Sequence, residues 1–274
     1  MASSLGKGPG DRVRGPAVAG SFYPGDPEGL REMVEGLLAS ASGEGAERAP
    51  KALIAPHAGF VYSGPVAASI YARLRRFRDL YSRVVLLGPA HRYLFHGIAA
   101  PSARAFRTPL GEVPLNRELL ARALELPSVR LLDEAHEGEH SLEVHLPFLQ
   151  TVLDEFALAP LVVGDAGMEE VASVLRALWG GEETLVVISS DLSHFLSYEE
   201  ANARDESTAE AIEALDPDGI GRDQACGRIP VGGLLLRARE EGLRVERVDL
   251  RNSGDTAGPR DQVVGYGSFL FTGR

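Results

Sequence analysis

Several side chains that bind metals or move protons follow short apolar runs of this 274-residue sequence. These are His57 after Ala52–Ala55, His91 after Val84–Leu87, and both Asp191 and His194 after Leu185–Ile188. Loops at the carboxyl ends of parallel strands converge at one edge of a sheet, so we expect these groups to lie together. Neutral imidazoles bind iron, copper, zinc and nickel, and the pattern therefore predicts a metal site.

Cys226 is the only cysteine of the chain and cannot form an internal disulfide. It is either an inert buried residue or a thiol used in chemistry. Because it precedes a helix expected to start near Pro230, backbone N–H groups and Arg228 should lower the pKa of its thiol. A thiolate would join His57 and His91 in a site of two histidines and one cysteine. Spacing alone does not establish this triad, because only the fold brings the three together.

Asp191 precedes His194 by three positions in SSDLSH, so both side chains can face one side of a helical loop. A carboxylate there can complete the coordination of a metal or orient an imidazole as a general base. Alternatively, Ser190 and Asp191 cap the helix that follows. The later loop 252–262 is either a wall of the pocket or only a turn.

Residues 136–140 read HEGEH and match H-E-x-x-H, the signature of zinc peptidases. That mechanism needs one helix through both histidines, and Gly138 in the middle disfavours it. We expect instead a helix from about Ser141, capped by that residue, whose leucines at 142, 146, 149 and 153 face the core. His145 then lies in the first turn, either beside the pocket or buried and bonded to backbone. A zinc metallopeptidase remains an alternative function.

The elements that must position these residues alternate between strands and helices. Helices are predicted over 27–40, 65–77, 169–179, 198–215 and 231–241, and further strands at 131–132, 161–163, 244–249 and 263–271. This alternation predicts an α/β fold with a sheet covered on both faces, whose last strand can run antiparallel. We expect a single domain over 14–274 after a flexible tip at 1–13.

Composition narrows the function further. The formal net charge is −11 and the basic residues are scattered, which argues against nucleic-acid binding. No apolar stretch reaches the roughly 18 residues of a membrane span, and the amino terminus lacks the apolar run of a signal peptide. We therefore expect a cytoplasmic protein that contacts no membrane. Nucleotide-binding glycine motifs and a G-x-S-x-G nucleophile elbow are absent from the sequence.

A series of ordered motifs from about residue 14 to the carboxyl terminus resembles the Memo family. The motifs are AVAGSFYPGDP, IAPHAGFVYSGPVAA, LLGPAHR, EHSLEVHLPFLQ, VISSDLSHF, CGRIPVG and NSGDT…VVGYGS. The chain is similar to the bacterial type, protein B of the AmmeMemoRadiSam system. That family is related to LigB-type class III extradiol dioxygenases, which implies a three-layer α/β/α fold with a central mixed, largely parallel sheet.

The resemblance also implies roles for particular residues. The metal ligands of the family fall on His57, His91 and Cys226, and its pocket residues fall on Asp191, His194 and His145. One motif departs from the pattern, because GPAHR stands where the family is expected to have GPSHH. A hydroxyl and a second histidine are thus lost beside His91.

The function implied is that of a non-haem iron or copper oxidoreductase of unknown substrate, with Fe²⁺ as the expected metal and zinc as a further option. Cysteine in place of the third carboxylate ligand of the dioxygenases would change metal preference and redox potential. Bacterial members are linked to a radical-SAM protein and an AMMECR-like protein, whereas animal members bind phosphotyrosine peptides. The alternative is a non-catalytic module that binds a peptide or small molecule, or handles metal, in the same pocket.

Overall fold

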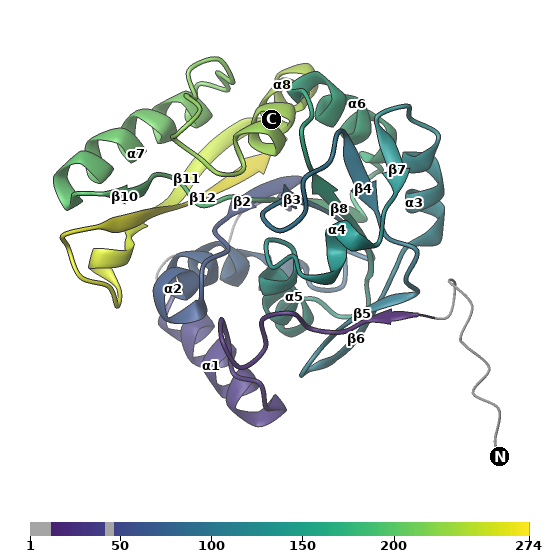
Figure 1. Ribbon diagram of the computed structural model, residues 1–274, viewed down its shortest axis with the longest axis horizontal. Helices are drawn as coiled ribbons and strands as arrows, with labels where there is room; N and C mark the ends of the chain where they lie inside the picture. The colour runs from purple at the N-terminus through teal and green to yellow at the C-terminus, as the bar shows by residue number, and fades with distance from the viewer. Residues whose placement is uncertain (1–11, 42–46, 274) are drawn as a thin grey trace.

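The computed structural model describes residues 12–41 and 47–273 (Figure 1). Residues 1–11 of the expected flexible tip lie outside this range. Within it, no helix is both long and apolar enough to cross a bilayer.

Nine strands of the described chain form one mixed sheet with the order β10-β12-β2-β9-β3-β8-β4-β7, and β11 pairs with β12. Their bounds are β2 (Ala52–Ala55), β3 (Arg83–Pro89), β4 (Ile98–Ala100), β7 (Val129–Leu131), β8 (Ala157–Val163), β9 (Thr184–Ser189), β10 (His194–Leu196), β11 (Arg244–Asn252) and β12 (Val263–Thr272). The central strands β2, β9, β3 and β8 are parallel, whereas β12 and β4 run antiparallel to their central neighbours. The expected antiparallel carboxyl-terminal strand is therefore confirmed.

Helices cover both faces of this sheet, which confirms the three-layer architecture (Figure 1). One face carries α1 (Pro27–Ser40), α2 (Phe60–Tyr71) and α5 (Leu146–Val152), and the other carries α3 (Arg117–Leu124), α6 (Met168–Leu178), α7 (Tyr198–Glu213) and α8 (Arg228–Glu241). Strands β2 and β9 are buried along their whole length, as parallel strands between two helical layers must be.

The paths that leave β2 and β9 create a crevice between them. These strands are neighbours, but β2 leads to α2 on one face of the sheet and β9 leads to α7 on the other. Chains that diverge in this way open a crevice at the carboxyl ends of the strands, where ligands bind in open α/β sheets. His57 and Asp191 lie at these two ends.

Two predicted helices start at other positions. Helix α2 begins at Phe60 rather than near residue 65, and continues after Tyr71 as a 3-10 helix, η2 (Ala72–Phe77). Gly59 occupies the N-cap position and Pro65 lies within the helix. A proline inside a helix costs one backbone hydrogen bond, which this helix accommodates.

The segment around Ser141 also differs from the prediction. The chain forms the short helix α4 (Glu134–Glu137), then the 3-10 helix η3 (Glu143–His145), and only then α5. The Ser141 hydroxyl caps no helix and donates to the carbonyl oxygen of Pro89 at 2.8 Å. The four leucines predicted to face the core are all buried.

A small second sheet lies beside the large one and was not predicted. It consists of β1 (Val13–Arg14), β5 (Ala105–Thr108) and β6 (Gly111–Pro114), with β1 parallel to β5. The buried Arg14 of β1 forms an ion pair with the fully buried Glu143 and donates to the carbonyl oxygens of His136 and Glu139. The amino-terminal strand thereby holds the backbone of the segment that lies beside the crevice.

Candidate metal centre

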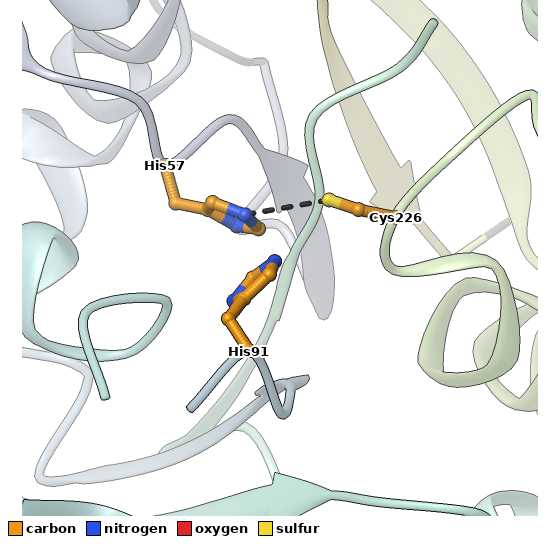
Figure 2. Close-up of side chains that lie close together, drawn as sticks. All are labelled: His57, His91 and Cys226. Atoms are coloured by element: carbon orange, nitrogen blue, oxygen red, sulfur yellow. Dashed lines mark hydrogen bonds between the residues drawn. The ribbon is translucent and has the colours of Figure 1, made fainter. Parts of the chain in front are cut away.

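The fold brings His57, His91 and Cys226 together from three segments far apart in the sequence (Figure 2). His57 follows β2, His91 follows β3, and Cys226 precedes the start of α8. One ligand atom from each residue lies within 4.8 Å of the other two. The two imidazole rings meet edge to face, with centroids 5.1 Å apart.

Hydrogen bonds fix the tautomer of His57. The Ser189 hydroxyl donates its proton to the carbonyl oxygen of Ser141 at 2.5 Å, so it can only accept from His57 Nδ1, which lies 2.6 Å away. The proton of neutral His57 therefore sits on Nδ1, and its Nε2 lone pair points toward Cys226. Burial first, and then the neighbouring His91 and His140, hold the pKa of His57 well below its usual value. A neutral imidazole is the form that binds a metal.

Glu139 fixes His91 in the same way. Its carboxylate accepts from the backbone N–H of His91 at 2.6 Å and lies 3.0 Å from His91 Nδ1. It also accepts from the backbone N–H groups of His140 and Ser141, each at 2.9 Å. Burial alone would raise the pKa of the Glu139 carboxyl, but these hydrogen bonds lower it to about 2. A permanently ionised carboxylate keeps the proton on Nδ1 and leaves Nε2 of His91 free, which is the usual partner arrangement of a metal-binding histidine.

The distance between His57 and Cys226 suits a first-row metal. Cys226 Sγ lies 3.3 Å from His57 Nε2, shown by the dashed line in Figure 2. Metal bonds of about 2.1 Å to nitrogen and 2.3 Å to sulfur, at angles of 90–109°, place the two atoms about 3.1–3.6 Å apart. Two free imidazole nitrogens and one sulfur therefore form a donor set that fits iron, copper or zinc.

The environment of the Cys226 thiol differs from the expectation. Burial, followed by the nearby Asp191 carboxylate, raises the pKa of this thiol above its usual value. Arg228 is not among the groups that shift this pKa, and its Nε donates to the carbonyl oxygen of Ile220 at 2.8 Å. A metal cation would itself have to displace the thiol proton.

Asp191 ties the ends of β2 and β9 to the cysteine. Its Oδ1 accepts from the backbone N–H of His57 at 2.7 Å, and its own backbone N–H lies 3.3 Å from Cys226 Sγ. Burial raises the pKa of its carboxyl above the usual value. Neither Ser190 nor Asp191 caps the helix that follows, because Ser197 is the N-cap of α7. The capping alternative is therefore wrong.

A cavity of about 440 Å³ opens beside the triad and is lined by Asp191, His194 and His140. The loop 252–262 supplies part of its wall, and Tyr62 lies on the same lining. His194 Nδ1 lies 2.8 Å from the carbonyl oxygen of Leu192 and must donate to it. The His194 Nε2 lone pair is then available to a molecule in the cavity.

A second cavity of about 440 Å³ reaches Cys226 from the other side. The ends of β3 and β8 and the start of α8 line it, together with the loop that carries Tyr93, Leu94 and Phe95. The His96 and Asp165 side chains on its lining are paired with each other at 2.9 Å. Both cavities are mainly apolar, and the one at Asp191 also places the His140 and His194 imidazoles on its lining.

His145 lies away from both cavities. Its ring is buried, and Nδ1 lies 2.8 Å from the Tyr71 hydroxyl. Burial, and secondarily the nearby His57, lower the pKa of His145 to about 3. Of the two alternatives from the sequence, a histidine beside the pocket or a buried one, the structure matches the second. Its hydrogen-bond partner is the Tyr71 hydroxyl.

The HEGEH segment does not form a peptidase helix. His136 lies in α4 with Nε2 3.0 Å from the carbonyl oxygen of Ala99, and α4 ends at Gly138. His140 instead lies against the rings of His57 and His91, stacked on His91 with centroids 4.7 Å apart. His136 is thus directed to the backbone of Ala99 and His140 to the ring of His91.

Sequence reasoning missed Glu139, His140 and Ser189 as site residues. The first two stand inside the HEGEH motif, which marked the right segment for the wrong chemistry. Ser189 is the last residue of β9, and a hydroxyl at that point gives no signal of its own. In the GPAHR motif, Arg92 is exposed, and His140 supplies the imidazole that lies next to His91.

Comparisons with known proteins agree with the resemblance seen in the motifs. A family model described as Memo-like protein matches residues 14–270. A "MEMO1 family protein" of Aquifex aeolicus is 38% identical over 271 residues, which cover 95% of this chain and 99% of the relative. A second, from Methanothermobacter thermautotrophicus, is 34% identical over 273 residues, covering 93% and 98%. The crystal structure of the uncharacterized protein JW3007 from Escherichia coli K12 superposes with a TM-score of 0.56 at 16% identity, covering 80% of this chain and 99% of that one, and shows a shared fold.

Proposed function

The chain belongs to the family of Memo-like proteins, and from the centre that it builds we propose a metal-binding protein that acts as a non-haem iron or copper oxidoreductase. His57, His91 and Cys226 are its ligands. The observation that carries the proposal is the pair of imidazoles whose Nδ1 atoms are held by Ser189 and Glu139, which leaves both Nε2 lone pairs free, with one ligand atom of each histidine within 4.8 Å of the cysteine sulfur.

The donor set favours a redox metal. Two imidazoles and a thiolate suit iron(II) or copper, and zinc shares the same ligands. Bound iron would supply one-electron chemistry with dioxygen, and three protein ligands leave coordination positions for small molecules. The resemblance to dioxygenases remains an analogy of fold, so the substrate is left open.

Residues around the centre would bind the substrate and move its protons. His194 presents an Nε2 lone pair to the cavity and can accept a proton there. Asp191 has a raised carboxyl pKa and orients His57 through its backbone N–H. His140 is the third ionisable group on this lining. We assign His145 no contact with substrate, because its ring is bonded to Tyr71 below the site.

Metal content tests the ligands directly. Protein purified anaerobically should contain about one metal ion per chain by elemental analysis, and His57→Ala and Cys226→Ser should lose it. His96→Ala is the matched control, because this histidine is exposed and pairs only with Asp165. Unchanged occupancy in the first two variants would refute the triad. The peptidase alternative predicts instead that zinc is lost on His136→Ala and kept in Cys226→Ser.

Oxygen consumption tests the reaction class. Iron-loaded protein is offered a panel of catechols and thiols in an oxygen electrode, with Cys226→Ser as the control. Uptake that depends on Cys226 supports an oxidoreductase. Tight stoichiometric metal without uptake for any compound favours the second candidate, a non-catalytic module that binds a small molecule or peptide or handles metal.

The second candidate rests on the two cavities, one that reaches Cys226 and one that is lined by Asp191 and His140. Each has about 440 Å³, within the range of small-molecule sites. Binding of a ligand there requires no reaction. A functional link to a radical-SAM protein and an AMMECR-like protein fits either candidate, and co-purification from the native host would test it.

A further inference from the structure

His194 belongs to a short segment whose backbone is held on two sides. On one side, Leu192 N donates to Gly265 O and Gly265 N donates to Ser193 O, both at 2.8 Å. On the other side, the Ser193 N–H donates to Asp205 Oδ1 on α7 at 3.0 Å. The carbonyl oxygen of Leu192 in turn accepts from His194 Nδ1. The carbonyl that sets the tautomer of His194 is thus part of a clamped backbone.

Asp205 is unusual in its position. Its side chain is only 3% exposed, and among the described residues it forms no salt bridge with a lysine or arginine. Burying a carboxylate costs free energy unless hydrogen bonds or charges compensate for it. Asp205 holds the segment that places His194 at the cavity, so the unfavourable burial of its carboxylate serves the site.

Gly265 completes the clamp from β12. A Cβ atom at this position would lie 1.9 Å from Asp205 Oδ2, so only glycine lets the strand and the carboxylate approach so closely. The chain then turns sharply at Phe195, which has a φ of +58°. A non-glycine residue in this region is strained and is retained where the surrounding structure imposes the conformation. Asp205 and Gly265 are the parts of the surroundings that contact the preceding residues.

We propose that Asp205, with Gly265, is a positioning residue that clamps residues 192–194 so that His194 carries its proton on Nδ1 and presents the Nε2 lone pair to the cavity. This inference rests on the proposed role of that cavity as the substrate site. Asp205 does not touch the substrate. It accepts from the Ser193 N–H and so fixes the adjoining carbonyl of Leu192, which accepts from His194 Nδ1. This role requires an oxygen that accepts a hydrogen bond and does not require the negative charge.

The test is the tautomer of His194, read by long-range ¹H–¹⁵N correlation spectra of the metal-free full-length protein. His194→Gln assigns the signals. The wild type should show Nδ1–H alone, whereas Asp205→Ala and Gly265→Ala should show a mixture of both tautomers. Asp205→Asn should retain the wild-type pattern, because its amide oxygen still accepts from Ser193. Glu206→Gln is the matched control, since this neighbouring carboxylate is exposed and pairs with Arg247.

A pure Nδ1–H signal in folded Asp205→Ala and Gly265→Ala would overturn the proposal, as would a mixture in Asp205→Asn equal to that in Asp205→Ala. If Asp205→Ala fails to fold, Gly265→Ala and Asp205→Asn make the same comparison. The readout needs no metal and no turnover. A failure of the clamp is therefore distinguishable from a failure of the metal centre, which elemental analysis reports.

Discussion

Replacing Glu139 by glutamine should weaken metal binding without removing any proposed ligand. Oε1 accepts from His91 Nδ1–H and from the backbone N–H groups of His140 and Ser141, whereas Oε2 accepts only from the backbone N–H of His91. Glutamine can keep its oxygen at the first position and retain three of these four bonds. Its amide nitrogen then faces the backbone N–H of His91. Both groups are donors, so this hydrogen bond is lost.

The size of the effect follows from the carboxylate that is lost. The pKa of Glu139 is lowered from 4.5 to about 2, which corresponds to about 3 kcal/mol of stabilisation of the ionised form. We expect Glu139→Gln to lower the free energy of unfolding at pH 7 by an amount of that order. Because loss of a histidine's carboxylate partner typically costs 10–100-fold in metal affinity, we expect the dissociation constant to rise by about that factor.

Competition of the metal-free protein with a chelator for Zn²⁺, which has no redox chemistry, measures this affinity. Glu137→Gln is the matched control, because this glutamate lies two residues away, is half exposed and pairs only with Arg12 at the surface. The control should bind Zn²⁺ as the wild type does. Equal affinities for Glu139→Gln and the wild type, with His91 still required for binding, would refute the view that the carboxylate orients the ligand.

Three further predictions concern the supports of the site. Arg14→Ala should destabilise the fold by about 3–5 kcal/mol in chemical denaturation, because it leaves a buried Glu143 carboxylate unpaired, whereas Arg12→Ala at an exposed pair should cost under about 1 kcal/mol. Ser189→Ala should weaken Zn²⁺ binding by about tenfold in the chelator assay, since the His57 tautomer is no longer held; unchanged affinity would contradict this. Burial lowers the pKa of His136 from 6.5 to about 4, so the unfolded state binds a proton first as the pH falls. Between pH 6.5 and 4, the free energy of unfolding of the wild type should therefore fall by about 3 kcal/mol more than that of His136→Asn. Parallel curves of unfolding free energy against pH for the two proteins would contradict this.

The parts of the fold that could be predicted are those whose signals are local. The runs Ala52–Ala55 and Leu185–Ile188 are apolar throughout because they lie in the middle of a sheet covered on both faces. The start of the helix predicted over 27–40 is also local, because Asp26 is the N-cap of α1 and its side chain accepts from Gly29 N. The second sheet could not be predicted, because β1 has two residues and its stability comes from pairing with β5, about ninety residues away in the sequence.

The position of the candidate ligands could be predicted in part, whereas the residues that hold them could not. Histidines at strand ends carry a signal, because the sheet edge collects them whatever lies between. The roles of Glu139 and Ser189 depend on which atoms they meet across the fold, and the thiol of Cys226 depends on its burial. Sequence proximity to a helix start and to Arg228 therefore gave the wrong direction for the pKa of the thiol.

The HEGEH segment shows why spacing alone assigns chemistry poorly. Two histidines four residues apart share a face only if the helix continues, and Gly138 ends it. His136 is then buried against Ala99, and Glu139 turns its carboxylate to the backbone and ring of His91. The same letters that resemble a zinc-peptidase site thus belong to a different group of residues, with Glu139 as a partner of His91 and His140 as its neighbour. The motif therefore marks the right segment of the chain, because α4 ends at Glu137 with Gly138 as its C-cap, and the backbone N–H groups of His140 and Ser141 turn toward Glu139.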